Sequence, residues 1–223
     1  MPRDDLTVIY YTANIDNEAF EARIRRTLWR NLRGIPLISV SQKPLEFGKN
    51  ICVGNVGPSY QNAFRQMQIG VQEAKTRYVC TAESDCLHPK EYFHFQPPTD
   101  DAFYVIMPLY VLFAQKGRAK YFAPKPRGSE GAMVVSRDYL LRALGDMLSG
   151  KGMWSEPYEN PELKNFTWLL HHGKRASFQS SISAITIKTD WQLHPKTPHD
   201  THTKLSELPY WGDAHALLRK YLR

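Results

Sequence analysis

The first third of the chain alternates between nearly continuous apolar runs and stretches in which apolar residues recur every three or four positions. The continuous runs are typical of strands whose sheet is covered on both faces. The periodic stretches are typical of amphipathic helices. The expected strands cover residues 6–11, 35–41 and 78–82, and the expected helices cover residues 16–33 and 59–74. This order predicts a parallel sheet joined by right-handed crossovers.

The ends of these elements are marked by residues that start or stop regular structure. Asp16 and Ser59 are expected to be the N-caps of the two helices, and Gly34 is expected to end the first one. Residues 42–58 lie between the second strand and the second helix and are rich in Gly and Asn. This segment is long for a connection in a compact domain, so we expect an irregular functional loop there.

The rest of the chain is expected to add strands and helices to the same domain. Pro108 interrupts the apolar residues 103–113, which predicts an edge strand or two short pieces. Two further strands are expected at residues 132–136 and 181–189, and three helices at residues 137–148, 161–172 and 213–222. The sequence has no internal repeat and no obvious linker, so we expect residues 1–223 to form a single domain.

Two carboxylates follow the third expected strand directly. Glu83 and Asp85 are separated by Ser84, so in an extended segment their side chains share one side. Carboxylates held that close repel each other, and a divalent cation between them, or between them and a phosphate, makes the pair favourable. Ligands of open α/β sheets bind just beyond the carboxyl ends of strands. The alternative interpretation is a solvated loop with two incidental acids.

Composition and charge narrow the class of protein. The hydrophobic fraction of 42% and the charged fraction of 23% suit a globular domain, and no apolar run has the length of a membrane span. We expect no signal peptide at the N-terminus. The odd number of cysteines, without zinc-site spacing, favours a reducing cytoplasm; they are Cys52, Cys80 and Cys86. A formal charge of +7 favours anionic partners such as nucleotides, nucleic acid or acidic lipid, or serves solubility alone.

Residues 115–128 combine cations with aromatic side chains. Tyr121 and Phe122 lie among the five cations, which are Lys116, Arg118, Lys120, Lys125 and Arg127. Cations neutralise phosphates and rings stack on bases, so the segment suits a nucleic acid or a sugar phosphate. An ordinary solvated loop is the alternative.

In order and spacing the chain resembles the nucleotide-sugar glycosyltransferases of the GT-A fold, most closely the family-2-like group. Its first strand ends in small polar residues, and a helix containing Asn62 leads into the strand before Glu83-Ser84-Asp85, where the family has Asp-x-Asp. The glycine-rich residues 128–131 resemble the turn before the family's acceptor-side strand. Residues 158–163 resemble the family's Glu-Asp segment.

The resemblance implies a GT-A-like, Rossmann-type α/β fold with a mostly parallel sheet flanked by helices and a C-terminal acceptor-side extension. It implies that residues 1–100 bind a nucleotide-diphosphate sugar, for which we expect a UDP-sugar, and that residues 101–223 bind the acceptor. The donor contacts implied are Thr12, Ala13, Asn14, Asn62, Glu83 and Ser84.

The resemblance also implies a metal ion and a catalytic base. Mn²⁺ or Mg²⁺ at Glu83 and Asp85 would neutralise the pyrophosphate as the sugar leaves. His199 and His202 are the candidates for the histidine that such enzymes often add to the metal, although both also suit a surface tail. Inverting transfer needs a carboxylate base, and the candidates, in order, are Glu159, Glu156 and Glu130.

The basic balance favours a large anionic acceptor, and we expect a hydroxymethylated base in double-stranded bacteriophage DNA, since compact phage DNA-modifying glycosyltransferases are similar in size. The protein would then act in the host cytoplasm. The expected acceptor contacts are Lys116, Arg118, Lys120, Lys125, Arg127 and Trp154. A saccharide acceptor, a nucleotidyltransferase and a basic nucleic-acid-binding module are the alternatives; the last leaves Glu83 and Asp85 unexplained. The sequence does not specify an oligomeric state.

Overall fold

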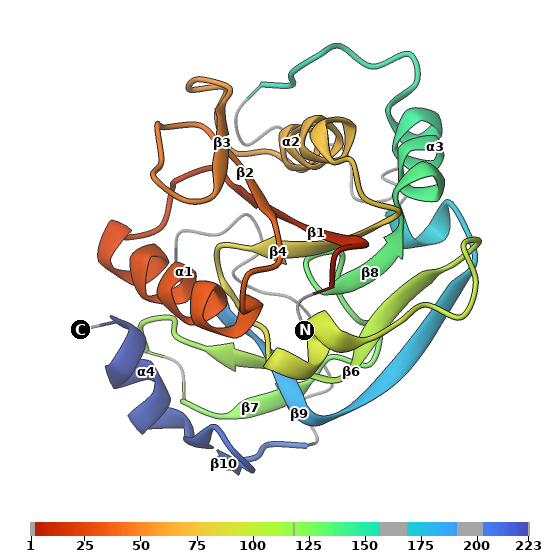
Figure 1. Ribbon diagram of the computed structural model, residues 1–223. Coiled ribbons are helices and arrows are strands. Elements are labelled where there is room, and N and C mark those ends of the chain that lie inside the picture. Colours follow the sequence, from red (N-terminus) through yellow and green to blue (C-terminus); the bar gives the residue numbers. More distant parts are fainter. Residues whose placement is uncertain (1–2, 118, 157–168, 191–202, 223) are drawn as a thin grey trace.

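The computed structural model describes residues 3–117, 119–156, 169–190 and 203–222. In this part of the chain a nine-stranded sheet has the order β3-β2-β1-β4-β8-β6-β9-β5, with β7 paired to β6 (Figure 1). Its strands are β1 (Leu6–Thr12), β2 (Leu37–Ser41), β3 (Lys49–Cys52), β4 (Tyr78–Glu83), β5 (Cys86–Leu87), β6 (Phe103–Phe113), β7 (Phe122–Pro124), β8 (Met133–Ser136) and β9 (Arg175–Lys188). A separate ribbon pairs β10 (Glu207–Leu208) with β11 (Gly212–Asp213).

Most strands of the large sheet run in one direction. β1 is parallel to β2 and β4, β2 is parallel to β3, and β6 is parallel to β9. β8 lies antiparallel between β4 and β6, while β5 and β7 are antiparallel to β9 and β6. Six of these nine strands therefore share a direction. The predicted α/β class, with a mostly parallel sheet flanked by helices, is confirmed.

Helices cover both faces of the sheet (Figure 1). α2 (Tyr60–Glu73) and α3 (Arg137–Leu148) pack on the face that includes Ile9. α1 (Glu18–Leu32), α4 (Ala214–Leu222) and the short 3-10 helix η1 (Lys90–His94) cover the other face, which includes Tyr10. A second 3-10 helix, η2 (Leu169–His171), packs near α3. In the described ranges, none of the helices has both the length and the apolar character needed to cross a bilayer.

Several expectations about regular structure are wrong. The side chain of Asn17, not Asp16, caps α1 by accepting hydrogen bonds from the backbone N–H groups of Ala19 and Phe20. β3 and β7 lie in segments expected to be irregular. Short strands such as these are stabilised by pairing with β2 and β6 rather than by their own sequence. The cap at Ser59, whose hydroxyl accepts from the Asn62 N–H, is as expected.

β6 is a continuous strand inside the sheet, so the prediction of an edge strand or two pieces is wrong. Pro108 is accommodated because the register between β6 and β9 shifts there, from Met107 opposite Gln179 to Leu109 opposite Ala184. Proline has no N–H to donate, and at such an irregularity none is required. β9 begins several residues before the expected 181–189. Of the helix expected at residues 161–172, residues 161–168 lie outside the described residues.

Gly70 allows α2 to pack closely on the sheet. A Cβ at this position would lie 2.6 Å from Ile9 Cγ2 and 3.1 Å from Val40 Cγ2. Gly70→Ala would gain up to about 1 kcal/mol of helix propensity. Overpacking a core costs about 1–3 kcal/mol, so we expect a net loss of unfolding free energy, measured by denaturant titration.

Gly145 of α3 is the matched control for this substitution. A Cβ there would meet no atom within 4 Å, so Gly145→Ala is expected to gain the helix propensity without the packing cost. Equal effects of the two substitutions on unfolding free energy would contradict the packing argument.

Candidate active site

The two acids singled out in the sequence lie together at the carboxyl end of β4. Glu83 is the last residue of the strand, and Asp85 occupies the turn between β4 and β5. The β1–β4 register places Tyr11 opposite Glu83, and the Tyr11 hydroxyl donates a hydrogen bond of 2.8 Å to Glu83 Oε1. Parallel pairing thus fixes the direction of the Glu83 carboxylate.

A thiol joins the two carboxylates. Cys86 is the first residue of β5, and its Sγ lies 3.3 Å from Asp85 Oδ1 and 4.0 Å from Glu83 Oε2. One donor atom from each of Glu83, Asp85 and Cys86 lies within 4.8 Å of the others. We refer to these three residues as the acid–thiol cluster. Its mixed oxygen and sulfur donors could hold a divalent cation.

Residues from two other parts of the chain surround the acid–thiol cluster. Lys188, at the end of β9, places Nζ 3.6 Å from Asp85 Oδ2, and both side chains are largely buried. Asp16, in the loop after β1, accepts a hydrogen bond of 2.5 Å from the hydroxyl of Thr189. Asp85 and Lys188 lie close enough to Asp16 to affect the pKa of its carboxyl group.

Burial, with a smaller contribution from the charge of Asp85, raises the pKa of both Glu83 and Asp16. Burial, followed by the charge of Asp85, raises the pKa of Glu83 to about 7, although Lys125 and Lys188 oppose the shift. Burial also raises the pKa of Asp16 to about 6, partly offset by the Thr189 hydrogen bond. A cation in their midst would stabilise the ionised forms.

The backbone at Gly131 packs closely against the Glu83 carboxylate, and a hydrogen bond from His88 holds it there. A Cβ on Gly131 would lie 2.3 Å from Glu83 Oε2, so only glycine fits without displacing the carboxylate. His88 Nε2 lies 2.8 Å from the Gly131 carbonyl oxygen, which can only accept, so the ring donates. Burial lowers the pKa of His88 to about 4, which keeps the ring neutral. The hydrogen bond from His88 holds the turn at residues 128–131 in place at Gly131.

Most of the predicted donor contacts take part in internal hydrogen bonds. The Thr12 hydroxyl donates to the Glu21 carboxylate, and Asn14 Oδ1 accepts from the N–H groups of Gln42 and Lys43. Asn62 is buried, and its amide joins α2 to two neighbouring loops, bonding the carbonyls of Val56, Gly57 and Ser155. Ala13 adjoins Thr12, and Ser84 lies in the turn between the acids. Their role in donor binding stays a prediction.

The three candidate bases differ in position. Glu130 adjoins Gly131, its backbone carbonyl accepts from the Thr81 hydroxyl, and burial raises the pKa of its carboxyl group. Glu156 is exposed, in the loop after α3 that also contains Trp154. Glu159 lies outside the described residues, as do the candidate metal ligands His199 and His202 and the candidate acceptor contact Arg118.

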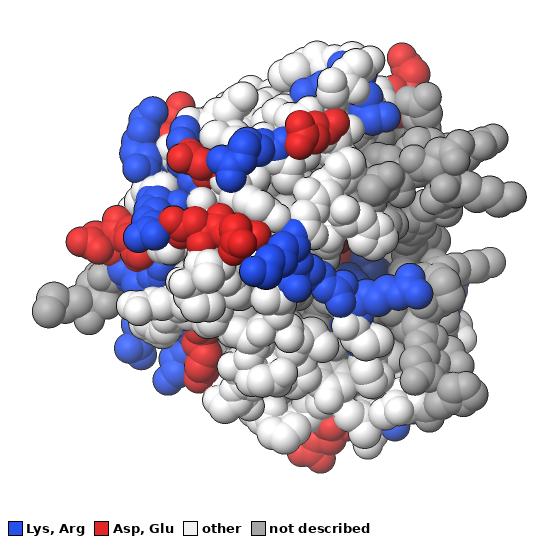
Figure 2. Space-filling view, turned by 90° about the vertical axis from the view of Figure 1, so that its right-hand side faces the viewer, with Lys and Arg blue, Asp and Glu red and all other residues white. Residues whose placement is uncertain are grey.

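The described cations of residues 115–128 differ in their contacts and exposure, so they do not form one basic surface. Lys125 hydrogen-bonds Ser129 and acts electrostatically on Glu83 and Glu130, so it belongs to the surroundings of the acid–thiol cluster. Lys120 instead donates to the Gln115 carbonyl, while Lys116 and Arg127 are exposed. On the described surface visible in Figure 2, blue cations form short rows interrupted by red acids rather than a continuous basic area.

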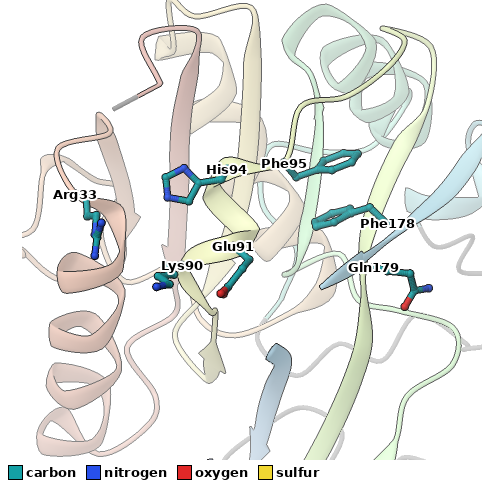
Figure 3. A pocket seen from close by; sticks show the side chains of 7 residues that line it. All are labelled: Arg33, Lys90, Glu91, His94, Phe95, Phe178 and Gln179. Atoms are coloured by element: carbon teal, nitrogen blue, oxygen red, sulfur yellow. The ribbon is translucent and has the colours of Figure 1, made fainter. Parts of the chain in front are cut away.

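A separate pocket of about 430 Å³ lies between the end of α1, η1 and β9 (Figure 3). It is lined by Arg33, Lys90, Glu91, His94, Phe95, Phe178 and Gln179. Phe95 and Phe178 stack with their centroids 3.8 Å apart and fill its apolar side. None of the site residues predicted from the sequence lines this pocket, so it is distinct from the acid–thiol cluster.

Four residues around the acids were not identified as site residues from the sequence: Tyr11, Asp16, Cys86 and Lys188. Tyr11 could have been found, because the parallel pairing of two predicted strands puts their last residues side by side. Lys188 could not, because nothing local indicates which strand β9 joins.

No protein-family model and no curated protein matches the sequence. Among solved structures, the bifunctional IspDF from Campylobacter jejuni is similar with a TM-score of 0.46 and 10% identity, over 79% of this chain and 50% of that one. A glycosyltransferase involved in glycosylation of the major capsid of PBCV-1 has a TM-score of 0.42 and 12% identity, over 78% and 81%. The inositol-1-phosphate CTP transferase from T. maritima has a TM-score of 0.45 and 11% identity, over 82% and 89%. At such values the likeness does not bear on the activity of this chain.

Proposed function

We propose that the protein is a glycosyltransferase that moves a sugar from a nucleotide-diphosphate sugar to an acceptor hydroxyl. The observation that carries the proposal is the close approach of Glu83 and Asp85 at the carboxyl end of β4, beside the end of the parallel strand β1. That edge of an α/β sheet is where ligands bind. The sequence resemblance to GT-A enzymes supplies the reaction class.

The donor set fits a hard divalent cation, Mn²⁺ or Mg²⁺, at Glu83 and Asp85. Both carboxylates can offer oxygen ligands. The pKa of Glu83 is raised first by burial and then by the charge of Asp85, and a bound cation would offset both effects. When bound, the cation would neutralise charge that develops on the leaving pyrophosphate. Tyr11 keeps the Glu83 carboxylate directed into the site through its hydrogen bond.

Two lysine side chains of the protein would also neutralise charge on the leaving pyrophosphate. Lys188 Nζ is already 3.6 Å from Asp85 Oδ2. Lys125, in the segment between β7 and β8, acts electrostatically on Glu83. Both ammonium groups are placed to attract a pyrophosphate. The same arrangement defines an alternative to the metal-dependent proposal, in which Lys188 and Lys125 supply the positive charge without a metal. Activity that survives exhaustive chelation would select this alternative.

A carboxylate base completes the proposal, and among the described candidates Glu130 is favoured. Its side chain is half-buried, and desolvation raises the pKa of its carboxyl group, which brings a carboxylate closer to the range suited to accepting a proton near neutral pH. Glu130 also adjoins Gly131, which packs on Glu83, so the loop that carries the proposed base lies against the cation site.

The proposal is tested by a thermal-shift screen of nucleoside diphosphates and nucleotide sugars, with and without Mn²⁺. A ligand that binds the native state raises the melting temperature, by an amount set by its concentration relative to Kd. We expect a UDP-sugar to give the largest shift and Mn²⁺ to increase it. If no nucleotide shifts the melting temperature at millimolar concentration, the donor assignment is wrong.

Binding of Mn²⁺ is expected to strengthen as the pH rises through about 7. The pKa of Glu83 lies at about 7 because of burial and Asp85, and only the ionised carboxylate binds a cation. Below that pKa a proton competes with the metal, so affinity should fall by up to about tenfold per pH unit. Calorimetric titration with Mn²⁺ at pH 6, 7 and 8 measures this, and a constant Kd would exclude Glu83 as a ligand.

The acceptor proposed is double-stranded DNA, with a saccharide as the alternative. DNA affinity must fall steeply with salt, since each neutralised phosphate releases a counterion. Changing Lys116, Lys120 and Arg127 to Ala should make the slope of log affinity against log salt shallower, by up to about one unit for each phosphate-binding cation removed. If the protein binds no DNA at low salt, the saccharide acceptor remains.

A further inference from the structure

Cys86 differs from the two other cysteines in what surrounds its sulfur. Cys52 is exposed on β3, and Cys80, on β4, is buried in the apolar core. Cys86 is also buried, but its Sγ has polar neighbours, with Asp85 Oδ1 at 3.3 Å, Glu83 Oε2 at 4.0 Å and Thr186 Oγ1 at 3.4 Å. Within the described residues, Glu83, Asp85 and Cys86 form the group of three whose donor atoms could bind one ion.

The spacing of these donors suits zinc. Zinc–sulfur and zinc–oxygen bonds of about 2.3 and 2.0 Å at a tetrahedral angle place the sulfur and oxygen roughly 3.5 Å apart. The observed separations from Sγ to the two carboxylates, 3.3 and 4.0 Å, lie on either side of that value. All three donor atoms lie within 4.8 Å of one another, so adjustment of the side chains would bring them onto one ion.

The ammonium group of Lys188 does not occupy the position that a metal ion bound by Cys86 and the two carboxylates would take. Its Nζ approaches Asp85 Oδ2, whereas Cys86 Sγ approaches the other carboxylate oxygen, Oδ1. The two oxygens of Asp85 can thus serve an ammonium group and a metal ion separately. Three carboxyl groups, those of Asp16, Glu83 and Asp85, lie near two ammonium groups, those of Lys125 and Lys188, so a cation that displaces protons from the carboxyl groups is compensated in charge.

We propose that Cys86 acts with Glu83 and Asp85 as a ligand for thiophilic divalent cations, and that this acid–thiol cluster binds zinc or cadmium more tightly than manganese or magnesium. Thiolate sulfur is a soft ligand that favours zinc and cadmium, whereas Mn²⁺ and Mg²⁺ are served by the carboxylates alone. Binding breaks the S–H bond and forms a sulfur–metal bond, and the proton passes to the solvent. If the proposed transfer uses Mn²⁺ or Mg²⁺, zinc inhibits it by occupying the same carboxylates; that consequence rests on the proposed function.

The test uses Cd²⁺ as the probe, because a cadmium–thiolate bond gives an ultraviolet charge-transfer band that carboxylates do not give. Cd²⁺ is titrated into the wild-type protein and into the Cys86→Ser and Cys52→Ser variants, with Mn²⁺ affinity measured alongside. We expect one ion and the band in the wild type and in Cys52→Ser. Cys86→Ser should lose the band and bind Cd²⁺ at least about tenfold more weakly, since even partners that only orient a ligand are worth roughly 10–100-fold in affinity.

Several results would overturn the assignment of Cys86. One is a band that persists in Cys86→Ser, and another is a band that disappears in Cys52→Ser. A third is the absence of any band in a wild-type protein that binds Mn²⁺, which would leave the proposed function intact. If Cys86→Ser does not fold, cadmium NMR of the wild type distinguishes a sulfur ligand from oxygen ligands alone. A band without any binding of nucleotide sugars would keep this inference and remove the proposed function.

Discussion

Asp85→Asn is expected to lower the rate of sugar transfer at least about a hundredfold, the scale on which loss of one preorganised electrostatic group slows catalysis. Asp85 offers its Oδ1 to the acid–thiol cluster and its Oδ2 to Lys188. Asparagine has nearly the same shape, but it carries no charge with which to hold a cation or to orient Lys188. Turnover of a nucleotide sugar with saturating Mn²⁺ is the measurement.

The fold of Asp85→Asn must be checked because Asp85 is buried. Removing its charge leaves Lys188 with Glu83 and Asp16 as neighbouring acids, so we expect a cooperative unfolding transition to persist. Asp85→Ala is the poorer test, since it also removes the side-chain atoms that contact Cys86 and Lys188. Asp146→Asn, at an exposed position of α3, is the control and should transfer sugar at the wild-type rate. Full activity of Asp85→Asn would exclude the acid pair as the centre of the reaction.

Glu130→Gln is expected to lower kcat by roughly two to four orders of magnitude, the range that general base catalysis contributes. Donor binding should change little, because the proposed base contacts the acceptor hydroxyl rather than the nucleotide. Glutamine keeps the size of the side chain while removing its capacity to accept a proton. Single-turnover kinetics at saturating donor, together with the thermal shift produced by that donor, separates the two effects.

Glu156→Gln is the matched control for the base, because Glu156 is exposed in the described loop after α3. It is expected to retain wild-type kcat. A loss of kcat in Glu156→Gln or Glu159→Gln, with Glu130→Gln unaffected, would move the base to residues 156–159. That result would favour the order of candidates that the family resemblance implies.

The sequence by itself determined much of the first half of the fold. The spacing of apolar residues in α1 and α2, and the continuous apolar runs of β1, β2 and β4, are local patterns with one favourable structure each. The approach of Glu83 and Asp85 was also predictable, because it depends on a strand end and one turn. No long-range contact is required to bring two residues that close in sequence together.

The tertiary structure determined which distant residues lie next to the acidic side chains. Lys188 and Thr189 lie roughly a hundred residues beyond Asp85, and they reach Asp85 and Asp16 because β9 pairs with both β5 and β6. The same pairing makes β6 an interior strand despite Pro108. The partner of a strand depends on packing of the whole sheet, and the raised pKa of Glu83 depends on burial that the complete fold creates. The local pattern therefore located the acids, and only the assembled sheet brought Lys188 and Asp16 to them.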